Sequence, residues 1–156
     1  MAYAKNTSVS TDRSEVQIKG ILRKHGADGI MIGENRDMVA IQFSMSNRQI
    51  RFIIPTPSPE DDDIKFTDSG KVRADGARQS ALDQAMRQRY RLLFLVVKAK
   101  LEAVESKVVT FDDEFLAHTV MPNGQTFGEI AKPQIETVYN TGKMPPLLGY
   151  QEEAQQ

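Results

Sequence analysis

The chain of 156 residues contains no cysteine, no tryptophan and only two histidines. The absence of cysteine excludes disulfide scaffolds, thiol catalysis and thiolate zinc sites. The two histidines, His25 and His118, are too few for a histidine-rich metal site. The formal net charge is −1, from 20 basic and 21 acidic residues. This balance excludes a uniformly basic nucleic-acid binder, but it is compatible with a basic face offset by an acidic one.

Long hydrophobic runs are also missing. The longest is the six-residue stretch Leu92–Val97, far below the ~20 residues that span a bilayer. The first residues contain no apolar run of the length that a signal peptide needs. We therefore expect a cytoplasmic protein without membrane contact, located in the bacterial host cytoplasm if a phage encodes it. None of the glycine-rich motifs that bind nucleotides occurs, and no cofactor is expected.

What the sequence does contain is a clear β pattern in its first third. Apolar and polar residues alternate in two stretches, 39–45 and 49–54, which is typical of half-buried strands. A two-residue turn at Ser46-Asn47 would place the apolar residues of both strands on one face, while Gln42 and Arg51 meet on the other. A short strand at 30–32 completes a three-stranded antiparallel meander.

Helical spacing dominates most of the remaining sequence. Apolar residues recur at steps of three and four between residues 82 and 104, which predicts a long helix over 77–106. This helix is apolar all round at Leu92–Val97, so we expect burial there on more than one side. Ser14 and Gln17 match a capping box for a helix over 15–25. Short helices are expected after Thr110 and after Thr126, the last one interrupted near Pro133 and ended by Gly142.

These elements predict one α+β domain, in which the meander packs on the long helix and small helices follow at the C-terminus. We place this domain at 14–150, between a flexible arm at 1–13 and a flexible tail at 151–156. The segment 55–77 is rich in Pro, Gly, Ser, Thr and Asp, and we expect a mobile loop there. Five residues at the centres of the two strongest apolar faces should be among the most buried: Phe43, Ile50, Phe52, Leu93 and Val97.

Arginines on the predicted hairpin and on the first half of the long helix give the main functional signal. Planar guanidinium groups bind phosphates bidentately, and the acidic run at 60–63 would leave positive charge concentrated elsewhere on the molecule. We therefore predict a nucleic-acid interface built from six residues: Arg48, Arg51, Arg78, Arg87, Arg89 and Arg91.

Two alternatives stay open. Glu114 and His118 are four residues apart, next to Asp112 and Asp113, and such ligands suit the divalent metal of a small nuclease. Acidic residues are also common in the first turn of a helix, so these four are only candidates and no metal site is assigned. A protein-binding surface is the other alternative, because methionine and arginine are favoured at interfaces. Five methionines lie near strand ends or turns: Met31, Met38, Met45, Met121 and Met144.

Five segments of the chain resemble a family of uncharacterised bacteriophage and prophage proteins. They are Asn6–Ser10, His25–Asp28, Arg48–Phe52, Lys98–Glu105 and Gly142–Pro145. The family has no established activity, and the resemblance assigns no catalytic residues. The order of a helix, a three-stranded meander and a long helix is also similar to the core of phage single-strand annealing proteins, a likeness of topology.

We therefore expect a phage-type accessory protein of DNA metabolism that binds nucleic acid without covalent chemistry, with single-stranded DNA as one form of the ligand. The alternatives are a protein-binding inhibitor or adaptor of a host or phage complex, and a small metal-dependent nuclease. A homo-oligomeric state is left open by the sequence.

Overall fold

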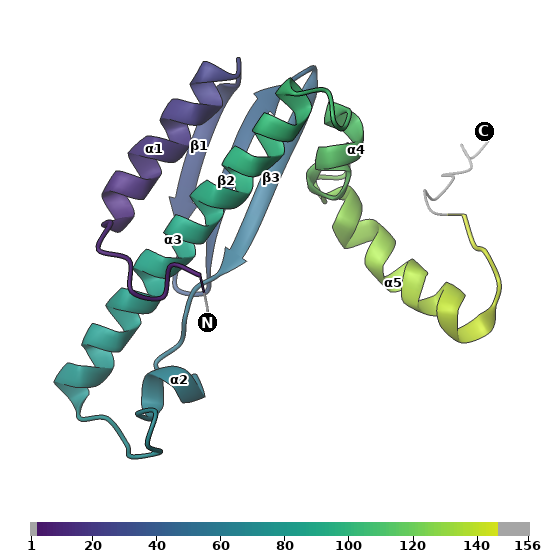
Figure 1. Ribbon diagram of the computed structural model, residues 1–156. Helices are drawn as coiled ribbons and strands as arrows, with labels where there is room; N and C mark the ends of the chain where they lie inside the picture. Colours follow the sequence, from purple (N-terminus) through teal and green to yellow (C-terminus); the bar gives the residue numbers. More distant parts are fainter. Residues whose placement is uncertain (1–2, 147–156) are drawn as a thin grey trace.

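The computed structural model describes residues 3–146 and has the predicted α+β architecture. A three-stranded antiparallel sheet carries two helices, α1 and α3, on one face, and the C-terminal helices lie beyond the β3 edge (Figure 1). The elements are α1 Thr11–Lys24, β1 Asp28–Glu34, β2 Met38–Met45, β3 Arg48–Pro55, α2 Asp62–Lys65, α3 Asp75–Glu105, α4 Phe111–Phe115, the 3-10 helix η1 Leu116–His118, and α5 Phe127–Thr141. The predicted tail at 151–156 lies outside the described residues.

The meander has the register that the alternation predicts. Ser46 and Asn47 have φ angles of 51° and 58°, as a two-residue type I′ turn requires. This turn pairs Phe43 with Ile50 on the core face. Gln42 pairs with Arg51, whose side chains lie on the outer face. Because a shift of one residue would exchange the two faces, this register confirms the predicted core face.

The two edges of the sheet differ. Beside β3, Thr119 forms a bridge with Ile50, and the Val120 N–H donates to the Gln49 carbonyl. The segment before α5 therefore extends the hydrogen bonding of β3. On the other side, β1 pairs with β2 alone within residues 3–146. Its register shifts between Asp28 and Met31, so the edge strand is irregular.

The core lies between the inner face of the sheet and the helices α1 and α3. The residues predicted to be most buried are each at most 6% exposed: Phe43, Ile50, Phe52, Leu93 and Val97. Helix α1 adds Ile18 and Leu22 to this cluster. Phe115 of α4 completes it, with its ring edge-on to two phenylalanine rings of the sheet.

Helix α1 begins one turn earlier than predicted. Its N-cap is Ser10, whose hydroxyl accepts a hydrogen bond from the Arg13 backbone N–H. Ser14, in contrast, is fully buried inside the helix. The predicted capping box at Ser14 is therefore wrong. Ser10 and Ser14 are both serines, but Ser14 faces the core, and the helix begins at Thr11 rather than at residue 15. The preceding segment lies against α3, where Gln84 donates to the carbonyls of Lys5 and Thr7.

The segment predicted as a loop at 55–77 contains defined structure. It includes α2, which packs on α3. Ile64 of α2 is buried, with an exposed fraction of only 3%. Phe66 and Val72 then form an isolated β-bridge, and α3 begins at Asp75. A helix of four residues is too short to produce a periodic pattern in the sequence. The prediction therefore depended only on the composition of the segment 55–77, which is typical of a loop.

Helix α3 is a single long helix, as predicted, but its middle is buried on one side only. Val97 faces the sheet and is fully buried, whereas Val96 is 45% exposed and Leu92 and Leu95 are half-buried. The expected burial on several sides is wrong, because the sheet covers this part of the helix from one direction. No helix within residues 3–146 combines the length and apolar character needed to cross a membrane.

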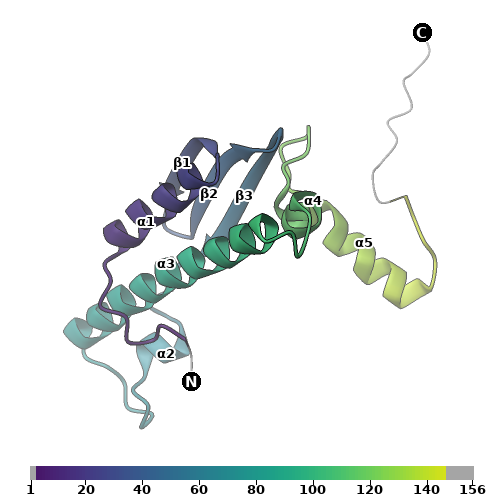
Figure 2. The same cartoon turned by 45° about the horizontal axis from the view of Figure 1, so that its top comes forward.

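The C-terminal helices have the predicted caps. The Thr110 hydroxyl accepts from the Asp113 N–H, and Thr126 and Glu129 form a reciprocal capping box. Helix α5 continues through Pro133 and ends at Gly142, which has a left-handed backbone conformation. The predicted interruption at Pro133 is therefore wrong, and the helix absorbs the loss of one backbone hydrogen bond. Figures 1 and 2 show α5 projecting away from the sheet.

Candidate nucleic-acid interface

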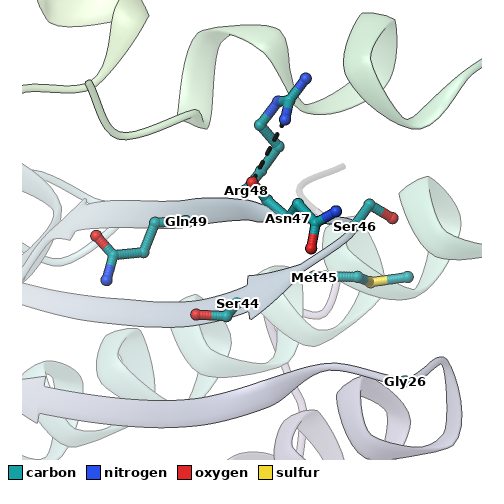
Figure 3. Close-up of a pocket in the computed structure, with 7 residues that line it drawn as sticks. All are labelled: Gly26, Ser44, Met45, Ser46, Asn47, Arg48 and Gln49. Carbon is teal, nitrogen blue, oxygen red and sulfur yellow. Dashed lines mark hydrogen bonds between the residues drawn. The ribbon is translucent and has the colours of Figure 1, made fainter. Parts of the chain in front are cut away.

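The six arginines predicted from the sequence do not share one surface. Arg48 begins β3 and forms an ion pair with Asp112 of α4, with 3.3 Å between Nε and Oδ1. It borders an open pocket of about 450 Å³ at the β2–β3 turn. Figure 3 shows its side chain extending away from the other residues that line this pocket. Arg48 thus connects the turn with α4.

Arg51 lies on the outer face of the sheet, where protein acceptors hold its guanidinium group. Its Nε donates to Gln42 Oε1 at 3.0 Å. One terminal nitrogen donates to the Gly124 carbonyl at 2.8 Å. The first bond lies within the sheet, and the second attaches the segment before α5 to it, so the immediate role of Arg51 is structural.

The four arginines of α3 fall on two sides of the helix. An α-helix turns by about 100° per residue, so Arg87 and Arg91 lie within about 40° of each other around the axis. Arg78 and Arg89 lie within about 20° of each other on the opposite side. Arg91 contacts Gln17 of α1, which shows that the first pair is on the α1 side.

A groove of about 340 Å³ lies between α1 and α3. Both helices line it, with Gln17, Gly20, Ile21 and Lys24 from α1 and Phe94, Lys98 and Glu102 from α3. Gly20 has no side chain, and nothing packs within 4 Å of the position that a Cβ would occupy there. The groove is therefore open to the outside at this point of α1. The half-buried side chains of Ile21 and Phe94 provide an apolar floor.

Positively charged side chains from both helices lie at this groove. The guanidinium carbon of Arg91 lies 4.8 Å from the centre of the Phe94 ring, and Arg91 also donates to Gln17 Oε1 at 3.0 Å. Lys24 and Lys98 line the same groove and form no ion pair with any residue in 3–146. Arg87 lies one turn before Arg91. The groove therefore combines cations with a partly exposed aromatic ring.

The end of the groove is fixed by a histidine between the two helices. His25 Nε2 lies 2.9 Å from the Glu105 carboxylate, and Nδ1 lies 2.9 Å from the Ile21 carbonyl. This ring joins the C-terminal ends of α1 and α3, so the two walls of the groove are held in register. Glu102 is the acidic side chain of the lining, and it also lies toward this end.

The acidic residues considered for a metal site have separate partners. Asp112 pairs with Arg48, and the Thr110 hydroxyl donates to Asp113 at 2.6 Å. Glu114 pairs with Lys100 of α3 at 2.8 Å. In the part of the chain that the structure describes, no three His, Asp or Glu side chains are grouped so that they could hold a metal ion. The structure thus gives each of these carboxylates a local structural contact.

His118, the fourth metal candidate, packs at the edge of the core. Its ring stacks on that of Phe52, with 4.0 Å between the ring centres. Burial, reinforced by the nearby ammonium group of Lys100, lowers the pKa of His118 from its ordinary value of 6.5. A neutral imidazole in this position acts as part of the aromatic cluster.

Sequence reasoning missed three residues of the groove, which are Lys24, Phe94 and Lys98. Lys24 follows Gln17 by seven residues, and Lys98 follows Arg91 by seven, so each pair shares one side of its helix. This spacing is visible in the sequence. It identifies a site only once α1 and α3 are known to pack side by side.

No protein-family model, no curated protein and no solved structure matches this chain. The groove between α1 and α3 is therefore assigned from its own geometry.

Proposed function

We propose that this chain binds single-stranded nucleic acid in the groove between α1 and α3, as a phage-type accessory protein of DNA metabolism without covalent chemistry. The observation that carries this proposal is that Lys24 and Lys98 line one groove with Phe94, while the Arg91 guanidinium group lies against the Phe94 ring. Proteins bind single strands with cations that follow the phosphates and aromatic rings that stack on bases. The groove supplies both kinds of group.

The number of cations predicts weak binding with a measurable salt dependence. Three cations count toward the groove, Lys24, Arg91 and Lys98, because Arg87 donates to Gln84 and lines a separate pocket beside Ser10 and Thr11. Each phosphate neutralised on a single strand contributes roughly 0.7 to the slope of log affinity against log salt concentration. The expected slope is therefore about −2, much shallower than that of a large basic surface.

Fluorescence anisotropy with a labelled oligothymidine, measured at several salt concentrations, tests this proposal. Lys24→Gln and Lys98→Gln should each weaken binding and reduce the salt slope by nearly one contact. Lys71→Gln removes the same charge from an exposed position between α2 and α3, and it should bind like the wild type. Absence of binding at low salt, or equal losses in all three variants, would contradict the assignment of the groove.

Arg48 provides a second test of whether nucleic acid binds at the groove or at the β2–β3 hairpin. Its side chain is not part of the groove lining and is paired with Asp112 of α4, so Arg48→Gln should leave the salt slope unchanged. A loss comparable with that of Lys98→Gln would move the interface to the hairpin.

A protein-binding adaptor or inhibitor is the second candidate function, favoured by the outer face of the sheet. Met31, Met38 and Ile53 are 59%, 37% and 43% exposed on this face, beside Arg51. Methionine and arginine are enriched at protein interfaces. A partner bound there should be lost with Met31→Glu and retained with Lys98→Gln, whereas the opposite result would place the partner at the groove.

A further inference from the structure

The groove between α1 and α3 contains one acidic side chain, Glu102, beside the two lysines Lys24 and Lys98. Lys98 precedes Glu102 by four residues on the same row of α3, yet Glu102 forms no ion pair with any residue in 3–146. A carboxylate repels phosphate groups. Glu102 therefore weakens the binding of any strand that brings only its phosphates to this end of the groove.

The spacing along α3 leaves room for one base between Phe94 and Glu102. Eight residues correspond to a rise of about 12 Å along the helix axis. A hydrogen bond to the carboxylate takes about 3 Å of this length, and the rest is enough for a single flat base. Lys98 lies between the two, but its side chain is exposed and long enough to turn outward to a phosphate. Across the groove, nothing lies within 4 Å of a Cβ built on Gly20, so the α1 side leaves space for the base.

The bases differ in what their Watson–Crick edges offer to a carboxylate, whose two oxygens only accept hydrogen bonds. Guanine presents two adjacent donors, the N1–H and the N2 amino group, which match the two oxygens. Adenine and cytosine each carry an unprotonated ring nitrogen beside the amino group, and the N3–H of thymine lies between two carbonyl oxygens. These acceptor atoms would face the second carboxylate oxygen and repel it. Guanine is therefore the base that pairs with a carboxylate through two parallel hydrogen bonds.

We propose that Glu102 selects guanine among the bases of a bound single strand, by accepting two hydrogen bonds from its Watson–Crick edge. This inference rests on the proposed binding of single strands in the groove. The guanine lies against the Phe94 ring, and Lys24 and Lys98 contact the phosphates of the same strand. Bidentate contacts to a base discriminate by about fivefold or more. Because Glu102 is exposed to solvent, we expect the lower end, a preference of about five- to tenfold.

Fluorescence anisotropy at low salt with three labelled strands tests this proposal. The strands are short oligothymidines in which every third base is left as thymine or replaced by guanine or by hypoxanthine. Hypoxanthine keeps the N1–H of guanine and lacks the N2 amino group, so it can form only one of the two hydrogen bonds. The wild type should bind the guanine strand about five- to tenfold more tightly than the thymine strand, with the hypoxanthine strand in between.

Two variants with the same change of charge locate the preference. Glu102→Gln should lose the guanine preference, because an amide has one acceptor oxygen in place of two. It should bind the thymine strand at least as tightly as the wild type does, since the repulsion of phosphates is removed. Glu136→Gln removes a negative charge from an exposed position on α5, a helix that lies apart from α1 and α3 (Figure 1). This control should keep the preference of the wild type.

The outcomes separate this inference from the proposed function. Equal binding of the thymine and guanine strands by the wild type would refute the selection of guanine and leave the binding of single strands intact. If Glu102→Gln strengthens the binding of all three strands by one common factor, the carboxylate only repels phosphates and the inference is wrong. If none of the strands binds to the wild type at low salt, the proposed function fails and the inference fails with it.

Discussion

Truncating Phe52 to alanine should destabilise this domain more than any other single change in the sheet. Phe52 is 4% exposed, and its ring is surrounded by three others. The ring centres of Phe43, Phe115 and His118 lie 6.5, 6.2 and 4.0 Å from its own. These neighbours belong to three different elements, so the void left by truncation would not close without moving β2, α4 or η1.

The expected cost follows from this arrangement. Replacing a buried phenylalanine by alanine costs about 3–5 kcal/mol, from lost burial and the residual cavity. Because the surrounding rings have little freedom to collapse, we expect a value in the upper half of that range. A typical domain has an unfolding free energy of about 5–15 kcal/mol, so the variant should be close to unfolding.

Urea denaturation followed by circular dichroism measures this cost directly. Phe52→Leu keeps most of the apolar volume and serves as the control, with an expected loss below about 1.5 kcal/mol. An alanine variant within about 1 kcal/mol of the wild type, at an unchanged denaturant slope, would refute the position of Phe52 at the centre of the core.

Three further predictions concern single positions. Gly128→Ala should lower the free energy of unfolding by about 1–3 kcal/mol, because the new Cβ would meet the Ala117 carbonyl oxygen at 2.9 Å. Gly20→Ala, where nothing lies within 4 Å of the new Cβ, should instead stabilise α1. Equal shifts of the melting temperature in the two variants would contradict the close approach of α5 to η1. The wild type should lose stability relative to His118→Phe as the pH falls below 6.5. The pKa of His118 is lower in the folded chain than in the unfolded chain, so the unfolded chain binds more protons in this range. Parallel pH profiles of the unfolding free energy in urea would refute this. Ser14→Ala should raise the unfolding free energy by up to about 1 kcal/mol, because the buried Ser14 hydroxyl has no hydrogen-bond partner within residues 3–146. A clear loss of stability in calorimetry would mean that this hydroxyl does form a hydrogen bond.

The sequence predicted the fold best where two local signals agree. In the hairpin, the alternation of apolar residues and the turn residues Ser46 and Asn47 lead to the same register, and a shift of one residue would have contradicted both. The start of α1 was ambiguous because Ser10 and Ser14 are both suitable caps. Only the burial of Ser14, a consequence of tertiary packing, decides between them.

The candidate site depends much more on long-range packing. The sequence correctly placed Arg87 and Arg91 on one side of α3, because that relation follows from helical spacing alone. It had no means of showing that Arg48 and Arg51 are held elsewhere, since their partners Asp112 and Gly124 are 64 and 73 residues away along the chain. Spacing within a helix is a local property, whereas membership of a groove requires two elements to be placed together.

The irregular edge at β1 bears on how copies of this chain can assemble. A regular edge strand offers a continuous row of backbone N–H and C=O groups to strands of other molecules, and such pairing is open-ended, so it leads to fibres and aggregates. In β1 the register shift at Asp28–Met31 breaks this row, and the exposed charged residues Asp28 and Glu34 stand at the two ends of the strand. Growth by strand addition is therefore disfavoured at this edge.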